Sequence, residues 1–164
     1  MARPTKYASL ICTTAMILAL IGIIIGLIIK SPLIIIIFLL PAVGYEIYRT
    51  QGESTIWASW AILGVFLAEI VLMIFNINYN LAKFMEQEEA YVGGHYVPLG
   101  DIKVFGPILM AILAVILFIR TRGIYTKWLA AIIFVTSFVI VYTMNPESFA
   151  ALLKAGIRQI FWYL

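Results

Sequence analysis

Long apolar runs without charge alternate with short polar breaks along this chain. The first run covers residues 7–29, which is 23 residues without a charge, and Lys30-Ser31-Pro32 ends it. The later runs cover residues 33–48, 56–75, 104–119 and 128–144. A helix needs roughly 17–25 apolar residues to cross the hydrocarbon of a bilayer. The pattern therefore predicts an all-α integral membrane protein with five transmembrane helices, forming one polytopic domain over residues 1–164.

The second run is the weakest of the five. It is short, and it contains Pro41 and Gly44, which are residue types that kink a helix or thin its contacts. A re-entrant hairpin at this run, leaving four full spans, is therefore the alternative.

The segment 76–103 is the longest polar stretch and is expected to lie in water. Asn76, Asn78 and Asn80 suit the end of the third run and the start of a short helix over 81–91, which would end before Gly93-Gly94. Asp101 is expected to cap the fourth run.

The tail, residues 146–164, has the pattern of an amphipathic helix. Asn145 can cap it, and Pro146 suits its first position. Its apolar stripe consists of Phe149, Leu152, Leu153, Ile157, Ile160 and Leu164, while Glu147, Lys154 and Arg158 fall on the opposite face. We expect this helix to lie along the membrane surface, or to dock on a partner.

Composition supports the membrane class and excludes others. The chain has 164 residues, of which 64% are hydrophobic and 12% charged, and its mean hydropathy is +1.07. A soluble domain is roughly 45–50% apolar and about 25% charged. This excludes a cytosolic enzyme, a nucleic-acid-binding domain and a disordered chain. The single cysteine, Cys12, excludes an internal disulfide and a four-cysteine metal site.

The distribution of basic and aromatic residues predicts the orientation. Five spans would place six Lys and Arg residues on the side of the N-terminus and five on the other side. Trp57, Trp60 and Trp128 fall at the more basic ends of their spans, as membrane-interface aromatics do, and Trp162 lies in the interfacial tail with Lys154 and Arg158. We expect the cytoplasmic membrane of a prokaryote, with the N-terminus inside and the 76–103 loop and C-terminus outside. The first run is too long for a signal-peptide core and is expected to be an uncleaved anchor.

Glu69 is the most informative single residue because it lies deep inside the third run. A charged carboxylate there costs about 2.5–3.5 kcal/mol on insertion scales, so it should be protonated, paired or facing a cavity. One interpretation is a proton or cation site shared with Asn76, seven residues further on, or a polar contact to the ligand of another subunit. The other is a neutral glutamate hydrogen-bonded to a neighbouring helix. Glu46, one turn before Arg49 at the predicted interface, is explained by an ion pair or by snorkelling.

Two runs carry small residues at helical spacing. In the first run these are Ala8, Cys12, Ala15, Ala19, Gly22 and Gly26, all on one face and including a GxxxG motif. The third run has a shorter set, Ala61, Gly64 and Ala68. Small faces let helix backbones approach closely in lipid, so both predict helix contacts, within the chain or with another subunit.

The rest of the chain offers no complete active site. Glu86, Glu88, Glu89, His95 and Asp101 share the polar loop, but this is the pattern of a solvated acidic face, and we expect no metal site. One histidine cannot supply a bis-histidine haem site. We expect no cofactor bound by this chain alone, leaving lipid or a cofactor held by a partner.

These features favour a non-catalytic integral subunit of a larger membrane complex of energy-transducing or transport type. Its expected partners are the lipid bilayer and other integral membrane subunits, with no nucleic acid. The alternative is a small homo-oligomeric ion or proton channel, or transporter, that uses Glu69 in its pathway. An enzyme acting on lipid or quinone ranks third, because its catalytic groups are not found in one place.

Overall fold

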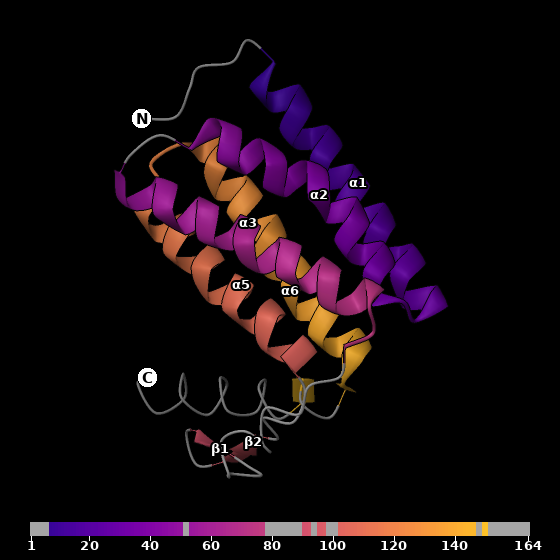
Figure 1. Ribbon diagram of the computed structural model, residues 1–164. Helices are drawn as coiled ribbons and strands as arrows, with labels where there is room; N and C mark the ends of the chain where they lie inside the picture. The colour runs from indigo at the N-terminus through magenta and orange to yellow at the C-terminus, as the bar shows by residue number, and fades with distance from the viewer. Residues whose placement is uncertain are drawn as a thin grey trace.

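The computed structural model describes residues 7–50, 53–77, 90–92, 95–97, 102–146 and 149–150, giving only the backbone of 53, 54, 102, 103 and the two strands. Over these residues the chain forms five long helices and one short hairpin (Figure 1). The elements are α1 (Ala8–Ile29), α2 (Pro32–Arg49), α3 (Glu53–Ile74), β1 (Ala90–Val92), β2 (His95–Val97), α5 (Ile102–Arg120) and α6 (Ile124–Met144).

Four of these helices are long and apolar enough to cross a membrane: α1, α2, α6 and the Thr55–Ile74 part of α3. This confirms the predicted helical membrane class. The described apolar part of α5 is shorter and runs from Val104 to Arg120. α2 continues as one helix through Pro41 and Gly44, so the re-entrant alternative at 33–48 is not the conformation that the chain adopts.

The bundle has α2 and α6 at its centre. α6 packs against α1, α2 and α5, and α2 packs against α1, α3 and α6. α3 and α5 also pack on each other (Figure 1). Short turns reverse the chain between α1 and α2, between α2 and α3, and between α5 and α6. The start of α1 and the turns after α2 and α5 therefore lie together, at what we call the α2–α3 end; the α1–α2 turn marks the opposite, α1–α2 end.

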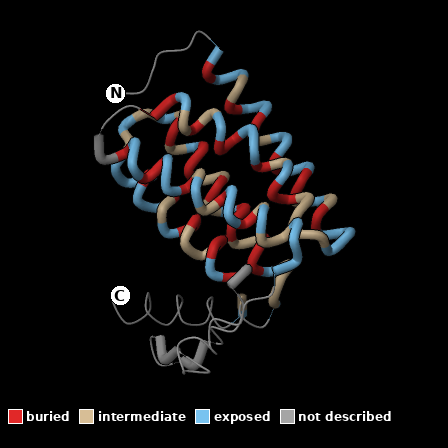
Figure 2. Tube along the Cα trace, viewed as in Figure 1, coloured by how far each residue is buried: buried red, intermediate tan, exposed pale blue. Residues whose placement is uncertain are grey.

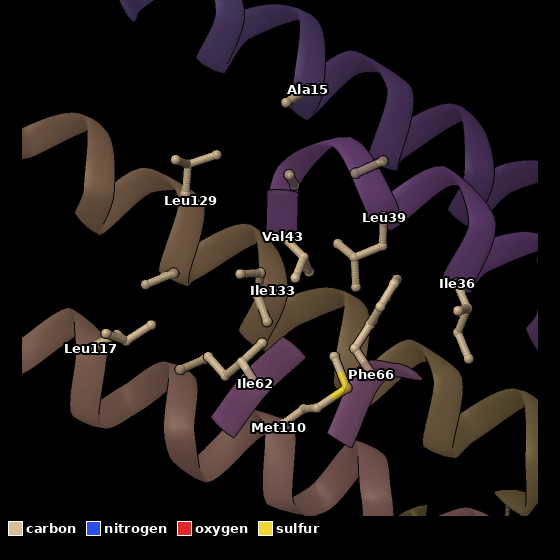
Figure 3. Packing of buried hydrophobic residues seen from close by; sticks show 14 of the residues in the cluster. Ala15, Ile36, Leu39, Val43, Ile62, Phe66, Met110, Leu117, Leu129 and Ile133 are labelled. Carbon is tan, nitrogen blue, oxygen red and sulfur yellow. The ribbon is translucent and has the colours of Figure 1, made fainter. Parts of the chain in front are cut away.

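Apolar side chains fill the centre of the bundle. The buried apolar positions of α2 are Ile35, Ile36, Leu39, Ala42 and Val43, whose spacing of three and four residues keeps them on one face. Figure 3 shows Leu39 and Val43 converging with Phe66 of α3 and Ile133 of α6. Figure 2 shows buried positions on the inner faces of the helices and exposed ones on the outer faces. The outer surface therefore suits lipid.

Buried hydroxyl groups on α6 bond to their own helix. Thr136 Oγ1 donates to the carbonyl oxygen of Ile132 and Ser137 Oγ to that of Ile133, both at 2.7 Å. A hydroxyl group without a hydrogen bond in hydrocarbon costs roughly several kcal/mol, as an unpaired backbone N–H or C=O group does. These residues are therefore compatible with a central membrane helix.

Two helices end at residues in the left-handed conformation. Lys30 follows α1 with φ 56°, and Asn76 follows α3 with φ 47°. After α3 the N–H of Ile77 donates to the carbonyl of Leu72, and that of Asn76 to the carbonyl of Met73. This is the Schellman arrangement, and asparagine tolerates the left-handed position better than most residues do. Asn76 therefore has a structural role as a helix C-cap.

The polar loop contains a hairpin that sequence reasoning missed. β1 and β2 pair antiparallel, with Tyr91 opposite Tyr96. The predicted helix over 81–91 is wrong at its last two residues, which belong to β1; residues 81–89 lie outside the described part. The signal for the hairpin was Gly93-Gly94 between residues of high β-propensity, a pair typical of two-residue hairpin turns.

The start of the tail turns back over the end of α6. The N–H of Phe149 donates to the carbonyl of Asn145 at 3.1 Å. The Phe149 ring packs edge-on against Tyr142 and Phe138, with centroids 5.4 and 6.4 Å apart. Residues 151–164, and so most of the predicted amphipathic helix, lie outside the described part of the chain.

We predict that Gly22→Ala and Gly26→Ala each destabilise the fold. A Cβ at Gly22 would overlap Phe38 Cβ, and one at Gly26 would overlap the Ile35 side chain. Overpacking a tight contact costs about 1–3 kcal/mol, which thermal unfolding in detergent, followed by circular dichroism, would detect. Gly44→Ala is the control, because nothing lies within 4 Å of its added Cβ. Equal stability in all three variants would contradict the close packing of α1 on α2.

Candidate functional site: two buried carboxylates and an exposed small-residue face

Glu69 lies inside the bundle, between α3 and α5. Only 1% of its surface is exposed. A Cβ added at Gly106 of α5 would overlap the Glu69 carboxyl group and come within 2.7 Å of its Cγ. The carboxyl group is therefore held against the α5 backbone at the point where α5 has no side chain. In this position Glu69 makes its contacts within the chain and does not reach the outer surface.

The structure does not bring Asn76 to Glu69. The helical spacing predicted that both residues share one face, but Asn76 is exposed whereas Glu69 is buried. The left-handed residue ends α3, so the periodicity of the helix no longer applies at that position. The structure thus buries Glu69 and exposes Asn76, and the proton or cation site shared by the two residues stays a prediction.

A second buried carboxylate, Glu46, belongs to a polar cluster at the α2–α3 end. Its Oε1 accepts a hydrogen bond of 2.9 Å from Thr50 Oγ1. Glu46 is 1% exposed and Arg49 7% exposed, so neither side chain extends into the aqueous phase in the way that snorkelling requires. Among the described residues, Glu46 Oε2 and Arg49 Nε have no hydrogen-bond partner, so the cluster keeps unused hydrogen-bonding capacity.

Side chains from three helices meet in this cluster. The Arg49 guanidinium lies 5.0 Å from the centre of the Tyr125 ring on α6 and donates a hydrogen bond of 3.5 Å to the Tyr45 hydroxyl. Cys12 of α1 donates from Sγ to the carbonyl oxygen of Tyr125, at 3.9 Å. A cation over an aromatic face contributes about 0.5–2 kcal/mol, and more where water is excluded. The cluster therefore ties α1, α2 and α6 together at this end of the bundle.

A sequence signal for this cluster was available. Glu46 and Arg49 continue the inward stripe of Leu39, Ala42 and Val43 at the same spacing of three to four residues. Extending the apolar pattern across the two charged positions would have placed both side chains inside. Gly106 had no comparable signal, because nothing local to α5 indicates which residue packs against it.

The small-residue face of α1 is used within the chain. All six positions are buried: Ala8, Cys12, Ala15, Ala19, Gly22 and Gly26. Gly22 lies against Phe38, and Gly26 against Ile35, so α2 covers the GxxxG part of this face. The Cys12 thiol is packed inside, consistent with its interpretation as a small packing residue.

The small-residue face of α3, unlike that of α1, lies on the outer surface of the bundle. Ala61, Gly64 and Ala68 are all exposed, and a Cβ at Gly64 would find nothing within 4 Å. Large apolar residues flank them on the outer surface, among them Trp60 and Leu67, which are more than half exposed. α3 therefore presents a shallow apolar face that no described helix of this chain covers.

Other predicted residues are distributed as follows. Trp57, Trp60 and Trp128 are exposed near the starts of α3 and α6, at the α2–α3 end. Lys154, Arg158 and Trp162 lie outside the described residues, as do Glu86, Glu88, Glu89 and Asp101. Among the residues that are described, no three His, Cys, Asp or Glu side chains are grouped as a metal site requires.

Comparison of the chain with protein-family models, with curated protein sequences and with solved structures found no match in any of the three.

The contact between Glu69 and Gly106 predicts coupled effects on stability. Gly106→Ala should lower the free energy of unfolding by about 1–3 kcal/mol, because the new methyl group displaces the carboxyl group. In a Glu69→Ala background the same substitution should cost little, because the space is open. Unfolding of the four proteins in detergent measures the cycle. A cost for Gly106→Ala that is the same in both backgrounds would rule out the contact.

Proposed function

We propose that this chain is a non-catalytic integral subunit of a larger membrane complex, of energy-transducing or transport type. In this proposal the chain has a structural role. It binds partner helices through the outer face of α3 and has no active site of its own. The proposal rests chiefly on the exposed small residues Ala61, Gly64 and Ala68.

Small residues on an outer face favour a protein partner over lipid. Lipid chains pack on large and small side chains alike, but two helix backbones approach closely only where the side chains between them are small. The corresponding face of α1 illustrates this, because α2 packs directly on Gly22 and Gly26. A partner helix could use the α3 face in the same way, with Trp60 and Leu67 beside it.

The interior of the bundle supports a packing role over conduction. Leu39, Phe66 and Ile133 close its centre, and Glu69 is buried against Gly106. A channel between copies of the chain would need the carboxylate on the outer surface, where Glu69 does not lie. The homo-oligomeric channel is therefore the weaker candidate.

The proposed topology has five spans, with α5 as the fifth membrane helix beside the four that are long enough by themselves. The N-terminus and the turns after α2 and α5 would be cytoplasmic, in the inner membrane of a prokaryotic cell. The exposed Trp57, Trp60 and Trp128 near that end support this arrangement, since tryptophan gathers at membrane interfaces.

Gly64→Leu should release the chain from its complex. Gly64 is exposed and an added Cβ would meet nothing within 4 Å, so the fold should be unaffected, whereas the leucine side chain blocks close approach of a partner helix. We expect at least a tenfold loss of co-purified subunits, roughly 1.4 kcal/mol of binding free energy, after mild extraction of the tagged protein and quantitative mass spectrometry.

Gly44→Leu is the matched control. Gly44 is also an exposed helical glycine with nothing within 4 Å, but it lies on α2. It should retain the same subunits as the unmodified chain. Equal retention in both variants would contradict the use of the α3 face.

A further inference from the structure

We propose that a water molecule is bound between Glu46 and Arg49, inside the polar cluster at the α2–α3 end, and joins the two side chains by hydrogen bonds. The proposal is independent of the function proposed above, because it concerns the buried face of α2 and does not involve the outer face of α3. It rests on one acceptor atom and one donor atom that are buried on the same helix face and have no partner among the described residues.

The hydrogen bonds of the two side chains are made to other residues. Glu46 Oε1 accepts from Thr50 Oγ1, and Arg49 Nη1 donates to the Tyr45 hydroxyl. Glu46 Oε2 and Arg49 Nε are buried and have no hydrogen-bond partner in the described part of the chain. Burying a charged group without its hydrogen bonds is costly, so such atoms in proteins are usually paired, with protein groups or with ordered water.

The spacing of the two residues suits a single bridging water. Glu46 and Arg49 are three residues apart on α2, and both are buried on the face that carries Leu39, Ala42 and Val43. Side chains at this spacing are neighbours, with roughly 5–6 Å between their Cβ atoms. Two hydrogen bonds of about 2.8 Å through one water molecule span up to roughly 5.6 Å between the outer atoms.

The chemistry of the two atoms selects water as the occupant. The Nε–H group of Arg49 can only donate, so the occupant has to accept a hydrogen bond. Glu46 Oε2 accepts when the carboxyl group is ionised and can donate when it is protonated, and water can pair with either form. The guanidinium repels a cation and the carboxylate repels an anion, whereas a small neutral molecule is compatible with both. Buried water molecules make roughly two to four hydrogen bonds of this kind.

The position near the end of the bundle gives water access to the site. Arg49 is the last residue of α2 and is 7% exposed, so the site adjoins the surface. Two further buried hydroxyl oxygens without a partner in the described chain lie at this end: Ser59 Oγ in the second turn of α3, and Thr121 Oγ1 just after α5. Thr136 and Ser137, near the middle of α6, instead donate to their own helix. This contrast is consistent with water at the α2–α3 end and hydrocarbon around the middle.

Nuclear magnetic resonance of the full chain in detergent, with isotope-labelled arginine, tests the proposal. A bound water gives a nuclear Overhauser cross-peak to the Nε–H proton of Arg49, and Arg49→Lys assigns that signal by removing it. We expect this cross-peak, and we expect the Nε–H proton of Arg49 to exchange about tenfold more slowly than those of the exposed Arg120 and Arg122. Exchange as fast as in those two residues, or slow exchange without a water cross-peak, would overturn the proposal.

Glu46→Gln and Glu46→Met are a matched pair of variants. The amide of the first keeps an acceptor and should keep the cross-peak, whereas the thioether of the second is a weak acceptor and should reduce it about fivefold, roughly the effect of one hydrogen bond. Circular dichroism establishes that both are folded, and Glu46→Leu replaces Glu46→Met if the latter is not. Equal cross-peaks in the two variants would contradict the role of Glu46. An Arg49 Nε–H signal that shifts with chloride concentration would overturn the proposal in favour of a bound anion.

Discussion

Close approach of helix backbones at small residues is the constraint on which this bundle depends. Lipid tails are as apolar as leucine, so burying apolar surface does little to drive the association of membrane helices. Close packing and hydrogen bonds between helices must therefore stabilise the bundle. The chain meets this requirement at two contacts. Gly22 and Gly26 bring α1 onto α2, and Gly106 lets α5 pack against α3 at the position of Glu69. The apolar core around Leu39 and Ile133 then fills the space between these contacts.

The same constraint explains where the polar groups are. Hydrocarbon offers no partner for a polar atom, so Thr136 and Ser137 bond to their own helix, and Glu69 is enclosed between two helices. Glu46 and Arg49 lie in a cluster near the end of the bundle, beside Tyr125 and Thr50. Intramembrane carboxylates often mark transport pathways. Here both are consistent with a different use, which is to hold particular helices together in one arrangement.

Much of the fold could be predicted from the lengths of the apolar runs, because a membrane helix makes its backbone hydrogen bonds within itself. The class and the approximate helix bounds followed from this, as did the small-residue positions. What could not be read is which helices face one another. Nothing in the sequence distinguishes the face of Ala15, which α1 buries within the chain, from that of Gly64, which α3 leaves exposed. The different burial of Glu69 and Asn76 could not be read from their spacing either, since helical periodicity ends where a residue turns left-handed. The hairpin at Tyr91 and Tyr96 was missed because a short strand and a short helix have similar local patterns.

In the proposed function, the α3 face around Gly64 is covered by another protein in the membrane. The most direct measurement is the mass of the unmodified, tagged chain after its membrane patch is excised with a lipid-retaining polymer and analysed intact. We expect a defined assembly in which this chain is one of several different integral subunits. A single copy of the chain surrounded only by lipid, or an assembly of identical copies, would contradict it.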